Sequence, residues 1–175
     1  IPEFANTFGA NNANALISLS QISETCCILL IPFFLKRFGI KRVMMIAMFA
    51  WVLRFGLFAT GDPGSGVWMF ILSMLVYGVA FDFFNISGAL YVDQNTHTDI
   101  RSSAQGLFMI MTNGFGASIG TILAMQVVNH YVVADASPAE QIEGWRICWA
   151  IFSAYALIVF LAFGLAFKEH RNAKN

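Results

Sequence analysis

The chain has 175 residues, of which 58% are hydrophobic and only 11% charged, and its formal net charge at pH 7 is zero. A typical soluble domain carries about 25% charged residues, so this composition, with a mean hydropathy of +0.67, excludes an ordinary soluble domain and indicates an integral membrane protein. Without an excess of positive charge, nucleic acid is not expected as a partner.

Five long apolar segments follow one another along the chain, separated by short polar connections. A helix needs about 20 mostly apolar residues to cross the roughly 30 Å core of a bilayer, whereas strands of outer-membrane barrels show an alternating pattern over roughly ten residues. The segments are too long and too continuously apolar for such strands. The sequence therefore predicts an all-α integral membrane protein with five transmembrane helices. The predicted spans cover about residues 15–35, 43–59, 67–92, 105–133 and 145–167.

Basic residues fix the predicted orientation of these spans. If the chain alternates between the two sides of the membrane, the basic loops fall on one side and the acidic loops on the other. Cytoplasmic loops carry an excess of Lys and Arg, so we expect an extracytoplasmic lead-in at 1–14 and a cytoplasmic tail at 168–175. An odd number of spans, in a chain that begins without Met, predicts that at least one helix is missing upstream. The basic side holds Lys36, Arg37, Lys41, Arg42, Arg101, Lys168, Arg171 and Lys174, and the opposite side holds Asp62, Asp135, Glu140 and Glu143.

Three ionisable residues fall inside the predicted spans, away from their ends: Glu24, Arg54 and Asp82. Such residues are costly in a membrane and by default mark a binding site, an ion pathway or a partner side chain. Gln21 lies three residues before Glu24 and therefore shares a helical face with it. The first span thus offers an amide beside a carboxylate.

The third span contains the stretch YGVAFDFFN, in which Asp82 lies inside an aromatic run. Tyr77, Phe81 and Asn85 are spaced by four and form one stripe, and Gly78, Asp82 and Asn85 form an overlapping one. Aromatic faces stack on flat or ring-shaped solutes, and carboxylates and amides hydrogen-bond hydroxyl and N–H groups. Desolvation also disfavours the charged form of a carboxylate, which suits proton coupling. The pattern predicts a site for a polar organic ligand.

A structural alternative stays open for the same charges. Glu24 or Asp82 could pair with Arg54 and simply join two helices. One arginine cannot fully neutralise two acids, so at least one acid needs another role. Elsewhere in the chain, Gly116 and Gly120 have the spacing that lets two membrane helices approach closely, and we interpret them as packing residues.

Enzyme signatures are missing from the sequence. It contains no Walker A motif, no G-x-S-x-G and no H-E-x-x-H. Cys26, Cys27 and Cys148 lie in apolar stretches without metal-ligand spacing, and we interpret them as small apolar residues. We therefore expect neither an enzyme nor a cofactor or metal site.

The connection between the first two spans, LKRFGIKRVMM, resembles the basic loop signature of the major facilitator superfamily, roughly G-x-x-x-D-R-x-G-x-K-R. Gly39, Lys41 and Arg42 match that signature, whereas Pro32 stands in place of its first Gly and Lys36 in place of its Asp. The loop match is partial.

Longer stretches, between about Ala15 and Val133, look like the nucleoside:proton symporter family (nucleoside permease type) of that superfamily. The stretches are SQISET, IPFFLKRFGIK, WVLRFGLFATGDP, VYGVAFDFFNISG and RSSAQGLFMIMTNGFG. The resemblance implies that the five spans are helices 8–12 of a twelve-helix transporter of the bacterial inner membrane, and so most of its C-terminal half. The implied partners are a nucleoside substrate, protons, the lipid bilayer and the missing N-terminal half of the same transporter.

The resemblance also implies a set of site residues, because the nucleoside lies between the two halves in that family. Glu24 and Asp82 are both candidates for carrying the coupled proton, and Arg54 is a candidate for a structural ion pair. Without its other half, the chain is not expected to transport. The substrate-binding positions that match the family motifs are Gln21, Glu24, Tyr77, Phe81 and Asp82.

Two alternatives of different kinds stay open. A major facilitator transporter for a sugar or another polar solute would also place aromatic rings beside carboxylates. A membrane scaffold that does not transport would use the acids only to pair helices. In the first case free ribose would compete with uridine, and in the second case neutral variants of the acids would change stability alone.

Overall fold

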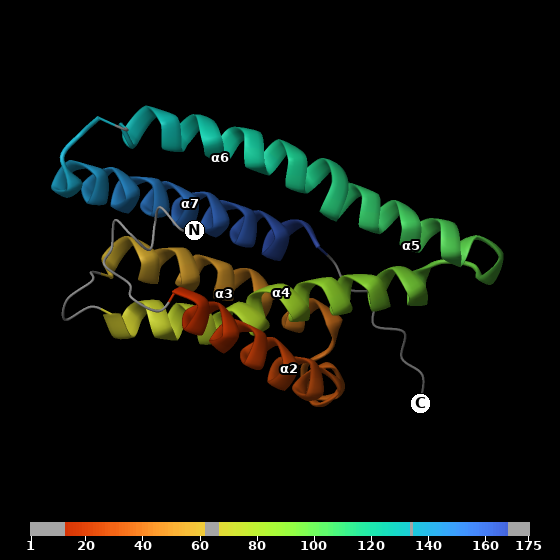
Figure 1. Ribbon diagram of the computed structural model, residues 1–175. Helices are drawn as coiled ribbons and strands as arrows, with labels where there is room; N and C mark the ends of the chain where they lie inside the picture. The colour runs from red at the N-terminus through yellow and green to blue at the C-terminus, as the bar shows by residue number, and fades with distance from the viewer. Residues whose placement is uncertain (1–12, 62–66, 134, 168–175) are drawn as a thin grey trace.

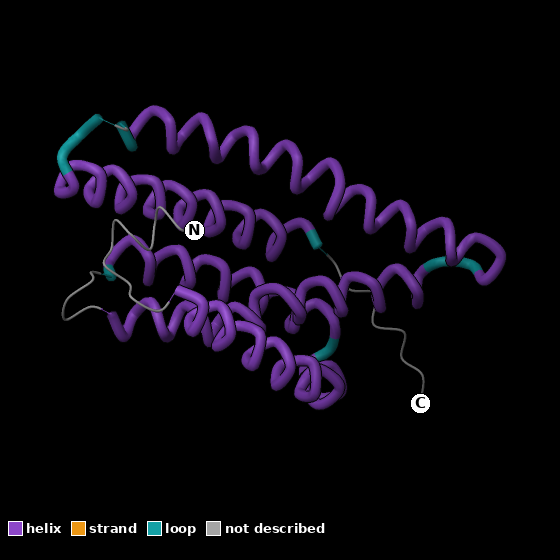
Figure 2. Tube along the Cα trace, in the orientation of Figure 1, coloured by secondary structure: helices purple, strands orange, loops and turns teal. Residues whose placement is uncertain are grey.

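The computed structural model describes residues 13–61, 67–133 and 135–167, and the regular structure in these ranges is entirely helical (Figure 2). The prediction of an all-α fold is confirmed. Within these ranges, five helical segments are long and apolar enough to cross a membrane. The helices are α2 (Ala13–Phe38), α3 (Ile40–Thr60), α4 (Val67–Asn95), the short 3₁₀ turn η1 (Thr98–Ile100), α5 (Arg101–Met109), the π-helix η2 (Ile110–Gly116), α6 (Ala117–Tyr131) and α7 (Pro138–Ala166).

Several observed helices extend beyond the predicted spans, most clearly at the start of α7, whereas α6 and α7 end one or two residues before the predicted ends, at Tyr131 and Ala166. The predicted span begins at 145, whereas α7 begins at Pro138 because its polar first turn is closed by a capping box. The Ser137 hydroxyl accepts a hydrogen bond from the Glu140 backbone, and the Glu140 carboxylate accepts one from the Ser137 backbone N–H at 2.9 Å. Such a turn satisfies its own backbone groups and needs no apolar residues. The tail at 168–175, and the lead-in at 1–14 up to residue 12, lie outside the described residues.

Removing the cap of α7 is expected to cost about 1 kcal/mol of stability. We expect Ser137→Ala to lower the thermal unfolding midpoint of the purified protein in detergent, because the Glu140 backbone N–H loses its acceptor. Ser137→Asn is the matched control, since asparagine caps helices about as well as serine. Equal midpoints for the two variants would show that the cap does not stabilise α7.

The turn between α2 and α3 is a single residue, Gly39, whose φ of 79° is the one positive φ among the described residues. Side chains other than glycine pay a steric cost in that region. The tight turn keeps the basic loop compact. Lys36, Arg37 and Arg42 are exposed, whereas Lys41 donates to the Gly164 carbonyl at 3.2 Å, near the last turn of α7.

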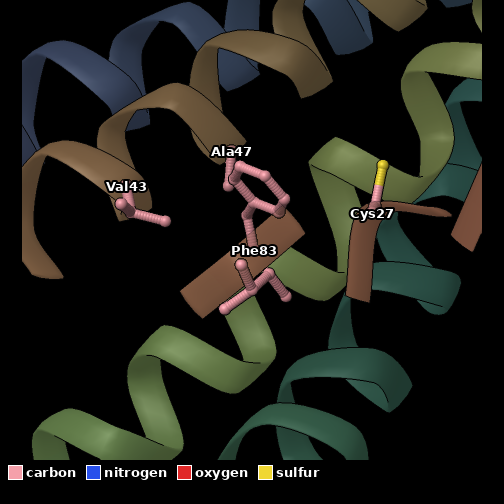
Figure 3. Packing of buried hydrophobic residues seen from close by; sticks show 5 residues of the cluster. Cys27, Val43, Ala47 and Phe83 are labelled. Atoms are coloured by element: carbon pink, nitrogen blue, oxygen red, sulfur yellow. The ribbon is translucent and has the colours of Figure 1, made fainter. Parts of the chain in front are cut away.

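Helix α3 lies at the centre of the bundle, between α4 on one side and α7 on the other, and α2 packs across α4 (Figure 1). The inner apolar cluster takes residues from three helices: Phe83 of α4, Val43 and Ala47 of α3, and Cys27 of α2 (Figure 3). Ile31 of α2 also belongs to it. A second cluster, around Phe58 and Phe70 and bordered by the tryptophans of α7, closes the other end of α3.

The segment α5–η2–α6 forms an outer layer beside α7, and each of its described side chains is at least partly exposed (Figure 1). Its contacts with the rest of the bundle lie at α4 and α7. A Cβ placed on Gly120 would have no atom within 4 Å, and one on Gly116 would meet the Met111 carbonyl of its own helix at 2.9 Å. The close helix contact expected at Gly116 and Gly120 is therefore not made within the described residues.

Candidate binding site between helices α2 and α4

The site begins where the backbone of α2 crosses that of α4. A Cβ placed on Gly78 would lie 2.7 Å from the carbonyl carbon and oxygen of Ser23 and 2.8 Å from the backbone nitrogen of Glu24. The two helices therefore touch through backbone atoms at this point. The Ser23 hydroxyl also donates to the Leu75 carbonyl of α4. Because glycine leaves no side chain in the crossing, Glu24 is brought against the face of α4 that carries Tyr77 and Asp82.

The two acids that the sequence places inside the spans, Glu24 and Asp82, both lie at this crossing. Asp82 is only 8% exposed, and its Oδ2 atom has no hydrogen-bond partner among the described residues. Glu24 is half-buried. Its carboxylate accepts a hydrogen bond from the Tyr77 hydroxyl and interacts electrostatically with Asp82. Two acids from separate spans thus share one polar cluster.

Aromatic rings form one wall of this cluster. Tyr77 and Phe81 stack with their ring centroids 5.7 Å apart and their planes at 16°. Trp51 of α3 meets Tyr77 edge-on, at 6.2 Å and 90°. Phe81 is 39% exposed, so its ring is accessible to a bound solute. Asn85 donates to the Phe81 carbonyl of its own helix, which occupies that amide N–H locally.

Arg54 lies on the α3 side of the cluster, with its guanidinium carbon 4.3 Å from the centroid of the Tyr77 ring. Among the described residues no salt bridge joins it to Glu24 or Asp82, although Glu24 interacts with it electrostatically. Its Nη1 atom is buried without a hydrogen-bond partner in the described part of the chain. The structural ion pair proposed for Arg54 from the sequence stays a prediction.

Gln21 is exposed on α2, one helical turn before Glu24. The structure therefore brings Glu24, Tyr77, Phe81 and Asp82 together and leaves Gln21 at the edge of the group.

An apolar groove of about 360 Å³ opens next to the cluster. It shares Trp51 with the cluster, and Asp82 is not part of its lining. The other lining residues come from α3, α4 and α7: Met48, Phe55, Phe84, Tyr155, Ala156 and Val159.

Sequence reasoning missed Trp51 as a residue of the site. The spacing could have found it, because Trp51 and Arg54 are three residues apart on α3 and share a face.

Among the described residues, no group of three or more His, Cys, Asp and Glu side chains is arranged to hold a metal ion.

Stacked rings beside carboxylates, inside a bundle of membrane-spanning helices, are suited to binding a polar ring-shaped solute within the bilayer. Comparison with known proteins gives the family. Residues 2–172 match the family model described as nucleoside H+ symporter. The chain belongs to this family.

Two curated relatives of Escherichia coli (strain K12) are each 49% identical to the chain. One is a xanthosine permease, aligned over 172 residues, which are 98% of this chain and 40% of the relative. The other is the nucleoside permease NupG, aligned over 168 residues, which are 95% of this chain and 39% of the relative. The chain thus spans about two fifths of the length of these relatives.

Solved structures agree with the sequence comparison. The crystal structure of the nucleoside transporter NupG is 48% identical and superposes with a TM-score of 0.82, covering 95% of this chain and 40% of that one. A mutant of the same transporter gives a TM-score of 0.84, with 96% of this chain covered.

Proposed function

We propose that this chain is part of a secondary transporter that carries nucleosides together with protons into a bacterial cell across the inner membrane. The observation that carries the proposal is the crossing at Gly78, which gathers Glu24, Tyr77 and Asp82 beside the exposed ring of Phe81. Membership of the nucleoside H+ symporter family supports both the substrate class and the coupling ion.

A nucleoside has a flat base and a ribose with hydroxyl groups, and the cluster offers partners for both parts. Tyr77 and Phe81 would pack against the base as a pair of nearly parallel rings. Asp82 has a buried carboxylate oxygen without a partner among the described residues, and in this proposal a ribose hydroxyl or a base N–H of the bound nucleoside would supply that partner. Gln21 would reach the edge of the nucleoside from α2.

The coupled proton would be carried by Glu24 or Asp82. Two carboxylates in one cluster repel each other when both are charged. When a proton binds one acid, the net negative charge of the site next to the substrate falls by one. This gives the site a direct means of linking proton binding to nucleoside binding.

The remainder of the site would come from the other half of the same transporter. Alternating access requires two bundles that move around a central site, and in this proposal the five helices are helices 8–12 of twelve. The basic loop after α2, with Lys36, Arg37 and Arg42 exposed, would lie in the cytoplasm together with the C-terminus.

The test is uptake of labelled uridine, driven by a proton gradient, in vesicles that contain the full-length parent. We expect saturable uptake that other nucleosides inhibit and free ribose does not. Asp82→Asn should lower uptake at low uridine concentration about tenfold or more, the size expected when a hydrogen bond to a charged group is lost. Asp135→Asn, the same change at an exposed loop residue, is the control and should leave uptake intact.

Each failure of this experiment has a distinct meaning. If well-folded wild type takes up no uridine, or if ribose competes fully, the substrate class is wrong. If Asp82→Asn transports like wild type, Asp82 is a structural residue.

A further inference from the structure

The central helix α3 is fixed on both sides at the level of the candidate site. The Ser73 hydroxyl of α4 donates to the Arg54 carbonyl at 3.4 Å, and the Ser153 hydroxyl of α7 donates to the Val52 carbonyl at 3.0 Å. Ser73 is fully buried. These bonds hold the α3 backbone in place at residues 52–54, so the Arg54 side chain leaves α3 from a fixed point.

The Arg54 guanidinium is surrounded by aromatic rings. Its central carbon lies 4.3 Å from the centroid of Tyr77, 5.4 Å from that of Phe58 and 5.7 Å from that of Trp51. A cation within about 6 Å of a ring is attracted by the ring quadrupole, most strongly where water is excluded. The shortest of these contacts is to Tyr77, which belongs to the candidate site.

Packing alone does not account for an arginine at this position. A buried guanidinium N–H without a hydrogen-bond partner is costly, and Nη1 of Arg54 is in that state among the described residues. An apolar side chain would fill the space between Phe58 and Trp51 without that cost. The positive charge interacts with Tyr77 and with Glu24, and the shortest of its ring contacts is the one to Tyr77.

Tyr77 is held on several sides. Phe81 stacks on it, Trp51 meets it edge-on, and its hydroxyl donates to Glu24. Arg54 adds an attraction that depends on how the ring is oriented, because a cation is favoured over a ring face and not at its edge. Loss of Arg54 would remove one restraint on the plane of the ring and would weaken the alignment of its hydroxyl with Glu24.

We propose that Arg54 is a positioning residue of the nucleoside site, which acts through Tyr77 and does not itself touch the nucleoside. Its guanidinium fixes the plane of the Tyr77 ring, so that the ring and Phe81 present one surface to the base. The inference rests on the proposed function.

The test is a double-mutant cycle on uridine affinity, measured with the purified full-length parent by calorimetry. We expect Arg54→Met to weaken binding about tenfold, as for a desolvated cation–aromatic contact. In a Tyr77→Leu background, the same change should weaken binding less than about twofold, because the ring on which Arg54 acts is gone. Arg54→Lys, which keeps the charge, should bind within about threefold of wild type.

Two further variants make the result decisive. Arg54→Gln keeps a planar polar group without charge, and it replaces Arg54→Met in the cycle if that variant does not fold. Arg146→Met removes another half-buried arginine, one that lies near the start of α7 and faces Glu143 at 3.9 Å. This control should leave uridine affinity within about twofold of wild type.

The outcomes separate this inference from the proposed function. If wild type binds no nucleoside, the proposed function fails and this inference fails with it. If wild type binds uridine but Arg54→Met or Arg54→Gln binds equally well, or if the effects of the two sites multiply independently, Arg54 does not position Tyr77 and the proposed function stands.

Discussion

Glu24→Gln is expected to abolish the accumulation of nucleoside driven by a pH gradient, while exchange of labelled for unlabelled nucleoside continues. Glutamine still offers a carbonyl oxygen to the Tyr77 hydroxyl, but it cannot take up and release a proton. Glu24 is half-buried and Asp82 only 8% exposed, so Glu24 is the acid that protons from water reach more readily. The substrate contacts proposed for Asp82 would remain.

The measurement compares two assays on the same vesicles containing the full-length parent. We expect uridine accumulation under an imposed pH gradient to fall at least tenfold, and uridine counterflow, which needs no net proton movement, to stay within a few-fold of wild type. Loss of both activities would make Glu24 a binding residue. Retention of both would leave Asp82 as the acid that carries the proton.

Gly78→Ala is expected to separate α2 from α4 and to weaken nucleoside binding about tenfold or more. The added Cβ would lie 2.7 Å from the Ser23 carbonyl group, a distance that forces backbone atoms apart. Overpacking of this kind costs about 1–3 kcal/mol, and the displacement moves Glu24 away from Tyr77 and Asp82. The hydrogen bond from Ser23 to the Leu75 carbonyl would be strained by the same movement.

The matched control is Gly56→Ala on α3. A Cβ at Gly56 would meet the Ser153 hydroxyl oxygen at 3.6 Å, an ordinary contact, and alanine favours a helix over glycine by about 1 kcal/mol. Uridine affinity and the thermal unfolding midpoint should therefore be unchanged or higher in this variant. If Gly78→Ala binds uridine as tightly as Gly56→Ala, the backbone crossing does not set the geometry of the site.

The cost of polarity in a membrane made the helices and the charged candidates predictable from sequence. Glu24 and Asp82 stand out because an acidic side chain inside a bilayer is costly and by default marks a functional site or a partner. The structure places both at one crossing. Periodicity gives the face on which a residue lies but not the helix that it meets. That α2 packs across α4, with Gly78 as the contact point, is therefore a property of the three-dimensional packing.

Other features lacked a readable local signal. The π-helix η2 at Ile110–Gly116 has the same apolar composition as the α-helical turns around it, so hydropathy cannot separate them. The first turn of α7 looks like a loop because Ser137 and Glu140 are polar, and only the capping geometry shows that they begin the helix. The spacing places Trp51 on one face with Arg54, but only the packing of α3 against α4 shows its contact with Tyr77.

The central place of α3 has a consequence for how the bundle is made. The hydrogen bond from Ser153 to the Val52 carbonyl joins positions 101 residues apart. At synthesis rates of about 5–20 residues per second, α3 spends roughly 5 to 20 seconds in the membrane before α7 is available to cover its second side. The early helices can form the crossing of α2 and α4 during that time, whereas the fixing of α3 by Ser153 waits for the last helix. On this order of synthesis the site forms in two stages: the acids gather first, together with the bond from Ser73 of α4 to the Arg54 carbonyl, and the bond from Ser153 of α7 to the Val52 carbonyl forms last.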